Sequence, residues 1–441
     1  MKILDFIKKH KILSLFISVF VIHAFFVIVM NNFNLQPFFS GGDDVMYNRS
    51  AVEISQEFSK GNFSLESIKI LYPDVYLLHF YPILIGVVYT IFSPNIIFGE
   101  LFNAILCAMV SLFVYWIIIE LNGSVRKAFV TGFIVSLYPS LALDGALLLK
   151  DALTACLALS ILLLIIKLIK CFDFWQFALL YLLLIPIINL RFYLGYALMS
   201  TFIFCWFLFH KNIKFKKRIL YTIIIIFIFG FLPQVAANQG YWGIKSFQQY
   251  INIKAITFYR EVAYVPQVTN KTLQPVLCGI AVNKSSISCG APNPSGTGST
   301  LNIKTDFKHP LSFLINYSES FVYVLLGPFP WQTKSLRQIL ALFETIPWYF
   351  IFYFAISGSI IQIKKKNTFI FPLIIFGIIF LSVISLFEVN FGNFMRTRIP
   401  IFISFLCLAP FGFNLNNKFL NKKYEKIFGY WRGGFHREQL G

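Results

Sequence analysis

Long apolar stretches, separated by short polar and often basic segments, recur along the whole chain. A helix rises 1.5 Å per residue, so crossing a bilayer takes about 20 mainly apolar residues. By this measure the pattern predicts ten membrane-spanning helices, at residues 12–30, 99–121, 128–147, 152–170, 174–190, 194–210, 219–237, 340–362, 368–387 and 399–415. The predicted fold class is therefore an all-α polytopic membrane protein.

Two shorter apolar stretches, 79–93 and 311–331, are ambiguous. If 79–93 crossed the bilayer, the following basic loops, such as the one at 211–218, would all face outward. Because short cytoplasmic loops carry the excess of Lys and Arg, the sequence favours a peripheral or re-entrant helix at 79–93. Each span moves the chain from one side of the membrane to the other, and the span after 311–331 must end inside at Lys364–Lys366. The number of crossings therefore predicts a second interfacial element at 311–331.

This alternation of sides divides the chain into four parts. An N-terminal transmembrane module covers 1–237 and includes a first outer loop at 31–98. A periplasmic loop follows at 238–339, then the C-terminal transmembrane helices at 340–415, and a basic cytoplasmic tail at 416–441. Both termini are predicted to be cytoplasmic. Within the first outer loop, the spacing of Ala51, Ile54 and Phe58 predicts an amphipathic helix lying along the interface.

Composition supports the membrane assignment and excludes one other class. Of the 441 residues, 57% are hydrophobic and only 13% charged, and the mean hydropathy is +0.71. Soluble domains carry roughly 25% charged residues. A formal net charge of +19 could suggest nucleic-acid binding, but most basic residues lie in short loops between apolar stretches, where they set topology. No nucleic-acid partner is predicted.

The long loop at 238–339 holds two further features. Cys278 and Cys289 predict a disulfide if the loop faces an oxidising compartment. The Gly- and Ser-rich piece at 290–299 resembles a phosphate-binding loop only in composition, because it lacks the Gly-Lys-Ser/Thr ending, so a flexible loop is predicted. No His or Cys pattern marks a metal site.

The first candidate functional segment is 40–47, Ser-Gly-Gly-Asp-Asp-Val-Met-Tyr, just after the first span. Adjacent carboxylates are costly near hydrocarbon, which points to a site at Asp43 and Asp44. The preceding glycines allow a sharp turn and close approach of a ligand. The alternative is a solvated loop whose aspartates begin the following helix. The sequence leaves both readings open, and they are compatible.

The predicted topology places further charged residues on the same face as this motif, at the ends of four other spans: Lys150, Asp151, Arg191, Arg396 and Arg398. Each one alone could be a side chain that reaches the interface from a helix end. Together they fit the transfer of a sugar from a lipid phosphate. An Asp can serve as general base for the acceptor hydroxyl, and Arg and Lys can hold the leaving phosphate.

At these positions the chain resembles the GT-C superfamily of membrane glycosyltransferases, particularly its protein mannosyltransferase and aminoarabinose transferase branch. Members typically carry Asp-Glu after the first span, with Tyr and Ala four and eight residues after the first acid. Asp43, Asp44, Tyr47 and Ala51 match that register, with Asp in the second place. Other similar segments are Tyr-Pro-Ile-Leu-Ile-Gly at 81–86, Tyr-Pro-Ser at 138–140 before Leu-Lys-Asp-Ala at 149–152, and Asn-Phe-Met-Arg-Thr-Arg-Ile-Pro at 393–400.

The resemblance implies a GT-C-like fold and a direct, inverting displacement on a polyprenyl-phosphate sugar at the periplasmic face of a bacterial inner membrane. It implies that Asp43 is the base and that Asp44 positions the acceptor or shares that role. The donor phosphate would lie on Lys150, Arg191, Arg396 and Arg398, while Asp151 and Tyr47 would orient the sugar or a metal. The implied acceptor is a surface glycan or a lipid-linked glycan.

Three questions stay open at this point. The same features fit a polysaccharide repeat-unit polymerase, which would transfer a preassembled oligosaccharide. They also fit a flippase or transporter of lipid-linked glycans, although such proteins often show internal repeats and no repeat is evident here. No cofactor is firmly indicated, and the carboxylates leave open whether a divalent metal ion takes part.

Overall fold

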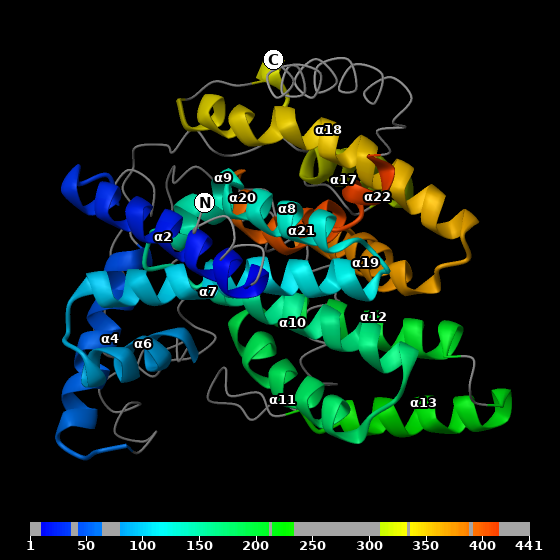
Figure 1. Ribbon diagram of the computed structural model, residues 1–441, viewed down its shortest axis with the longest axis horizontal. Coiled ribbons are helices and arrows are strands. Elements are labelled where there is room, and N and C mark those ends of the chain that lie inside the picture. The colour runs from blue at the N-terminus through cyan, green and yellow to red at the C-terminus, as the bar shows by residue number, and fades with distance from the viewer. Residues whose placement is uncertain are drawn as a thin grey trace, which may run out of the picture.

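The computed structural model describes residues 10–36, 43–63, 80–210, 214–232, 309–332, 336–387 and 391–413. Within these ranges the regular structure is helical, with no strand, so the all-α fold class is confirmed there. Figure 1 shows the helices as a layered bundle, with α7 and α10 crossing its middle. The predicted disulfide at Cys278 and Cys289, and Gly41 and Gly42 of the acidic motif, lie outside the described residues.

Three helices of the N-terminal half pack on α7 (Ile96–Glu120): α2 (Lys11–Asn32), α8 (Val125–Ser136) and α10 (Asp151–Lys170). Helix α10 is apolar all round and is almost entirely buried between its neighbours. By contrast, α2 exposes one side through Val21, Phe25 and Ile28. A helix that is apolar on every side is expected inside the bundle, while an exposed apolar face fits contact with lipid.

Further helices pack beside this group (Figure 1). They are α11 (Phe174–Leu190), α12 (Phe192–Phe209), α13 (Phe215–Gly230), α17 (Pro310–Leu326), α18 (Leu336–Lys364), α19 (Phe371–Phe387), α20 (Phe391–Thr397), α21 (Ile399–Leu406) and α22 (Ala409–Gly412), with short 3-10 turns η1 (Pro330–Gln332) and η2 (Thr368–Ile370). Helix α18 approaches α22 closely. A Cβ atom at Gly358 would lie 2.2 Å from the carbonyl oxygen of Leu408, so only glycine fits there.

Six of the described helices are long and apolar enough to cross a membrane: α2, α7, α10, α12, α18 and α19 with its preceding turn. A seventh crossing results if the bent pair formed by α8 and α9 (Pro139–Gly145) counts as one span. Helices also occur where the other three spans were predicted, but α11, α13 and α21 with α22 are shorter. The multi-pass membrane character is therefore supported, and the count of ten stays a prediction.

The span predicted at 128–147 is not one continuous helix. It divides into α8 and α9, whose axes differ by 60°. Pro139 lacks a backbone N–H and disfavours helical geometry at the residue before it, and Tyr138 is extended, with φ −64° and ψ 118°. The break turns the short helix α9 back into the bundle. It thereby carries Asp144 to a position that a straight helix would not give it.

The first outer loop contains a helical hairpin of α4 (Asp43–Ser59) and α6 (Phe80–Ile91). Ala51, Ile54 and Phe58 do lie on one side of α4, as their spacing predicts, and all three are buried. They pack against α6 rather than facing outward: a Cβ atom at Gly86 would lie 2.6 Å from Ile54 Cγ2. Twelve residues span about 18 Å, so α6 is too short to cross a bilayer by itself.

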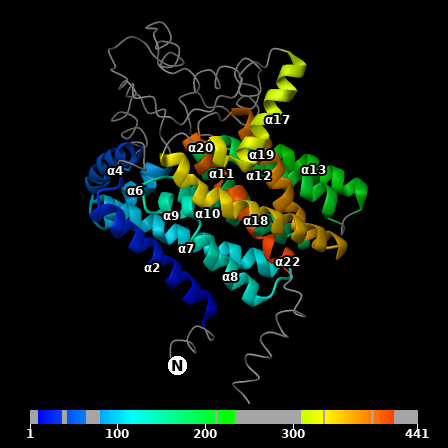
Figure 2. The same ribbon diagram turned by 90° about the horizontal axis from the view of Figure 1, so that it is seen from above.

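Turns predicted to lie on one side of the membrane also meet in the structure. At the far end of the bundle from α4, Lys170 Nζ lies 2.7 Å from Glu120 Oε2, and Asn367 Nδ2 donates to the Leu121 carbonyl at 3.0 Å. In Figure 2, α4 and α20 lie toward the upper edge of the bundle, while the beginning of α2 and α22 lie toward the lower edge. The bundle therefore has two distinct ends.

Candidate functional site

Charged residues from five separate turns meet at the α4 end of the bundle. The residues come from the beginning of α4, from α9, from the beginning of α10, from the junction of α11 and α12, and from α20: Asp43, Asp144, Lys150, Asp151, Arg191 and Arg396. Of these, all but Asp144 were candidates from the sequence. We call this set the Arg396 cluster.

Arg396 is the residue that joins the two most accessible acids of the cluster. Its Nη1 donates to Asp43 Oδ2 at 3.0 Å, and its Nε lies 3.9 Å from Asp144 Oδ1. The Asp43 side chain is 50% exposed, whereas that of Asp144 is 10% exposed. Burial lowers the pKa of Arg396, but the carboxylates of Asp144, Asp151 and Asp43 outweigh this and raise it above the usual value. One accessible carboxylate thus lies beside a permanently charged guanidinium group.

A second ion pair lies deeper in the cluster. Arg191, at the junction of α11 and α12, donates through Nη2 to Asp151 Oδ1 and through Nη1 to the hydroxyls of Tyr193 (2.8 Å) and Thr397 (3.2 Å). Both charged side chains are buried. Asp151 is also in the first turn of α10, where the helix dipole favours a negative charge. Thr397 directly follows Arg396, so this pair also fixes the end of α20.

Lys150 provides a cation without a carboxylate partner among the described residues. Its Nζ lies 3.4 Å from the Leu190 carbonyl oxygen, and no ion pair to it occurs in the described ranges. Burial, followed by repulsion from Arg191, lowers the pKa of Lys150 to about 8. This ammonium group is the cation of the cluster best able to accept an anionic ligand, because binding requires no resident ion pair to break.

The other two residues of the acidic motif point inward. Asp44 is 3% exposed, and its Oδ1 has no hydrogen-bond partner within the described parts of the chain. The Tyr47 ring packs edge-on against Tyr81, with centroids 5.3 Å apart. Burial, and then the charges of Asp43 and Asp151, raise the pKa of Tyr47, so its hydroxyl keeps its proton. Only Asp43 of the adjacent acids is accessible.

Arg398 is not part of the Arg396 cluster. Its side chain is fully buried, where Nη2 lies 3.2 Å from Glu344 Oε1 and Nη1 donates to the carbonyls of Gly327 (2.5 Å) and Val324 (3.3 Å). The rings of Phe394 and Phe402 lie 5.2 and 4.4 Å from the guanidinium carbon. The predicted contact of Arg398 with a donor phosphate would require these bonds to break.

Glu344 links this buried arginine to α9. Its Oε1 accepts from the Tyr138 hydroxyl at 2.6 Å, and its Oε2 accepts from the Ser140 backbone N–H at 3.0 Å and from the Ser140 hydroxyl. Ser140 is four residues before Asp144, and Arg398 is two residues after Arg396. Through Glu344, α18 therefore holds the helices that carry two residues of the Arg396 cluster. We call Glu344, Arg398, Tyr138 and Ser140 the Glu344 cluster.

Sequence reasoning missed three acids, and each had the same signal. Asp144, Glu344 and Glu100 are acids within predicted spans, where a charge is costly and usually has a partner or a role. Glu100 is fully buried and accepts from Asn31 Nδ2 at 2.6 Å and from Gln36 Nε2 at 3.0 Å. It thus fixes the chain that leads from α2 towards the acidic motif.

No group of three or more His, Cys, Asp or Glu side chains within the described ranges could hold a metal ion. Comparison with known proteins gives no relative: no family model matches the chain, and neither a curated protein nor a solved structure does. The geometry of the Arg396 cluster is the basis for any functional assignment.

Proposed function

We propose that the protein is a membrane glycosyltransferase that uses a polyprenyl-phosphate sugar as donor. The single observation that supports this most is the Arg396 cluster. It joins an accessible carboxylate, Asp43, to cations contributed by distant turns, at one end of an apolar bundle. A lipid-linked donor would keep its chain in the bilayer and present its phosphate and sugar at this end. The acceptor is a surface glycan or a lipid-linked glycan.

The proposed reaction is one inverting displacement. The oxygen of an acceptor hydroxyl attacks the anomeric carbon, and its proton passes to the Asp43 carboxylate. The bond between the anomeric carbon and the phosphate oxygen breaks, and the polyprenyl phosphate leaves with the electron pair. A positioned general base contributes roughly 10²–10⁴-fold to such a reaction. The half-exposed side chain of Asp43 is the acid of the motif that an acceptor can reach.

The cations would hold the leaving phosphate. Lys150 offers a point charge with no resident carboxylate partner in the described parts of the chain, and Arg396 offers a planar donor surface. Arg396 already contacts both Asp43 and Asp144, so a phosphate on Arg396 would weaken its hold on Asp43 and free that carboxylate to contact the acceptor. Arg191 is held by Asp151 and would act mainly by placing Lys150 and α20.

The proposal places this end of the bundle at the periplasmic face of a bacterial inner membrane, with both termini in the cytoplasm. The distribution of basic residues supports that orientation. It also agrees with the way the turns meet, since those predicted to face outward supply the Arg396 cluster. Asp44, which is buried, would not contact the acceptor.

The decisive experiment replaces Asp43 by Asn. In vesicles that contain the purified protein and a radiolabelled polyprenyl-phosphate hexose, we expect Asp43→Asn to lower transfer at least 100-fold without lowering the amount of folded protein. Glu53→Gln is the matched control, since it removes one carboxylate from the same helix at an exposed ion pair with Arg49.

Two outcomes would count against the proposal. Transfer at the normal rate in Asp43→Asn would remove Asp43 as the base. A protein that moves the lipid-linked sugar between leaflets, with no covalent product in any glycan fraction, would identify a transporter instead. Analysis of surface glycans from cells with and without the protein then identifies the acceptor.

A further inference from the structure

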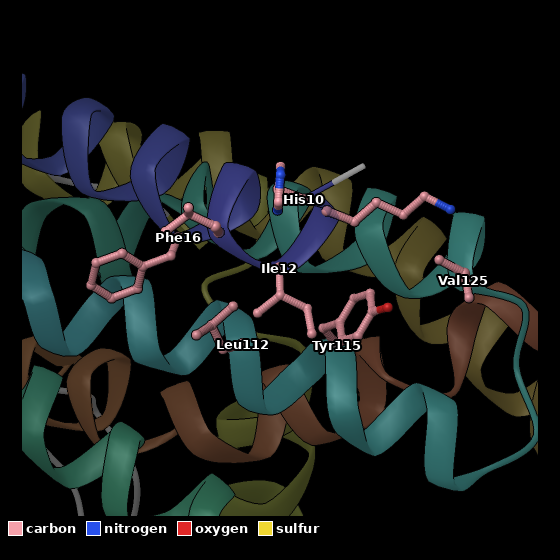
Figure 3. Close-up of a pocket in the computed structure, with 8 residues that line it drawn as sticks. His10, Ile12, Phe16, Leu112, Tyr115 and Val125 are labelled. Carbon is pink, nitrogen blue, oxygen red and sulfur yellow. The ribbon is translucent and has the colours of Figure 1, made fainter. Parts of the chain in front are cut away.

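A groove of about 680 Å³ opens at the opposite end of the bundle from the Arg396 cluster. It lies between the beginning of α2, the C-terminal half of α7 and the beginning of α8, as Figure 3 shows. The groove is lined by the apolar residues Ile12, Leu13, Phe16, Leu112 and Val125 and by the polar residues His10, Lys11 and Tyr115. Its volume falls within the roughly 300–1,000 Å³ typical of sites for small organic ligands.

The groove lies at the level of a membrane boundary. Helix α2 begins there and ends beside Glu100, next to the acidic motif. Its 22 residues correspond to about 33 Å, close to the thickness of the hydrocarbon core, about 30 Å. A ligand in the groove would therefore contact the leaflet opposite the one at the candidate site.

Basic residues lie in and beside the groove. Lys11 lines it, and the exposed Arg126 directly follows the lining residue Val125. Neither α2 nor α8 has an acidic residue in its first turn, so the positive ends of two helix dipoles face no nearby carboxylate on their own helices. The nearest acid at the end of α7, Glu120, is paired with Lys170. These groups thus favour an anion.

We propose that this groove binds an anionic glycerophospholipid of the leaflet on that side. The phosphate lies between Lys11, Arg126 and the beginning of α8, and an acyl chain extends along Phe16 and Leu112. Apolar lining residues beside Lys11 and Arg126 fit an amphiphile with a negative headgroup. A zwitterionic phospholipid is disfavoured, because its own cation would approach the same basic residues. The site is separate from the donor site and does not depend on the proposed transferase activity.

The test measures lipid binding to the purified full-length chain by native mass spectrometry. The probes are phosphatidylglycerol and phosphatidylcholine with identical acyl chains, titrated into detergent. We expect phosphatidylglycerol to bind more tightly. The double variant Lys11→Ala/Arg126→Ala should weaken it by roughly 25-fold, or about fivefold for each cation removed. The control Lys216→Ala/Lys217→Ala removes the same charge from exposed positions on α13 and should change binding less than twofold.

A second variant tests the apolar part of the groove. Val125 is 39% exposed, so Val125→Trp adds bulk to the groove without entering the core, and it should abolish retention of phosphatidylglycerol while thermal stability stays normal. Four results would overturn the proposal. The first two are equal affinity of the protein for both lipids and unchanged phosphatidylglycerol affinity of the Lys11→Ala/Arg126→Ala variant. The other two are a higher affinity of the protein for polyprenyl phosphate than for phosphatidylglycerol, and increased lipid retention when residues 2–9 are removed. The last two would identify the lipid carrier or the N-terminal segment as the occupant.

Discussion

The two arginines of the Arg-Thr-Arg segment, Arg396 and Arg398, end up in opposite environments. Arg396 is partly accessible and divides its contacts between Asp43 and Asp144. Arg398 is fully buried, with one carboxylate, two backbone carbonyls and two aromatic rings around it. Arg396 can therefore exchange partners with a ligand, whereas the charged groups of the Glu344 cluster are buried and cannot reach one.

The two clusters differ in how much it costs to break their ion pairs. A buried ion pair gives little net stabilisation, but the loss of one partner is costly because the other charge stays buried. An accessible pair can be broken at low cost, since water solvates the freed group. We therefore expect substitutions in the Glu344 cluster to act on stability, and those that break the accessible pair of Arg396 and Asp43 to act on activity.

The largest effect on stability is expected from Glu344→Ala. It leaves the guanidinium of Arg398 and the hydroxyl of Tyr138 buried without their carboxylate. The expected loss is about 3–5 kcal/mol, seen as a large fall in the thermal unfolding temperature in detergent and in the yield of folded protein.

A paired substitution separates charge from packing. Glu344→Leu combined with Arg398→Met removes both charges at similar volume, and replacing a buried ion pair in this way is often neutral. We expect it to recover most of the stability lost in Glu344→Ala. If the paired variant is no more stable than Glu344→Ala, the ion pair is not the reason for the loss.

Arg396→Ala is expected to lower activity more than stability. The half-exposed Asp43 would regain water, while the mostly buried Asp144 would lose the guanidinium group 3.9 Å away, so the unfolding temperature should fall, but less than in Glu344→Ala. The rate of transfer should fall roughly 10–100-fold, because one charge-assisted contact to the leaving phosphate is lost. Arg396→Lys, which keeps the charge and loses the planar fork, should be intermediate. Normal transfer by Arg396→Ala would remove Arg396 from the site.

A smaller effect is expected from pH. The pKa of Lys150 is lowered to about 8, so its ammonium group is charged below that pH and loses its charge above it. The KM for the donor should therefore rise severalfold between pH 7.5 and 9.5. Lys150→Arg stays charged over this range, so its KM should stay nearly constant. The same rise in KM in Lys150→Arg would assign the titration to another group.

The smallest effect is expected from Arg49→Ala in α4. Arg49 pairs with Glu53 at 3.1 Å, but its side chain is 82% exposed. Pairs of this kind contribute less than about 0.5 kcal/mol. Thermal unfolding and transfer should both remain close to those of the unmodified protein. A marked loss of transfer would indicate that the acceptor also contacts the outer side of α4.

The apolar stretches predicted most of the helices within one turn of their observed ends, because length and hydropathy alone decide which segments leave water. The alternation of membrane sides along the chain also predicted that one end of the bundle carries Asp43, Lys150, Asp151, Arg191 and Arg396. The structure brings these residues together. Which face of the membrane that end contacts, and what reaction it performs, stay predictions.

Tertiary packing decided the environment and the partners of each charged side chain. Nothing in the spacing of Arg396 and Arg398 reveals that one is accessible and the other buried, since that depends on Glu344, more than fifty residues earlier in the chain. The contribution of Asp144 likewise depends on the break between α8 and α9, which turns it towards Arg396. Hydropathy acts along the chain and can be read from the sequence, whereas the pairing of buried charges depends on which helices pack together.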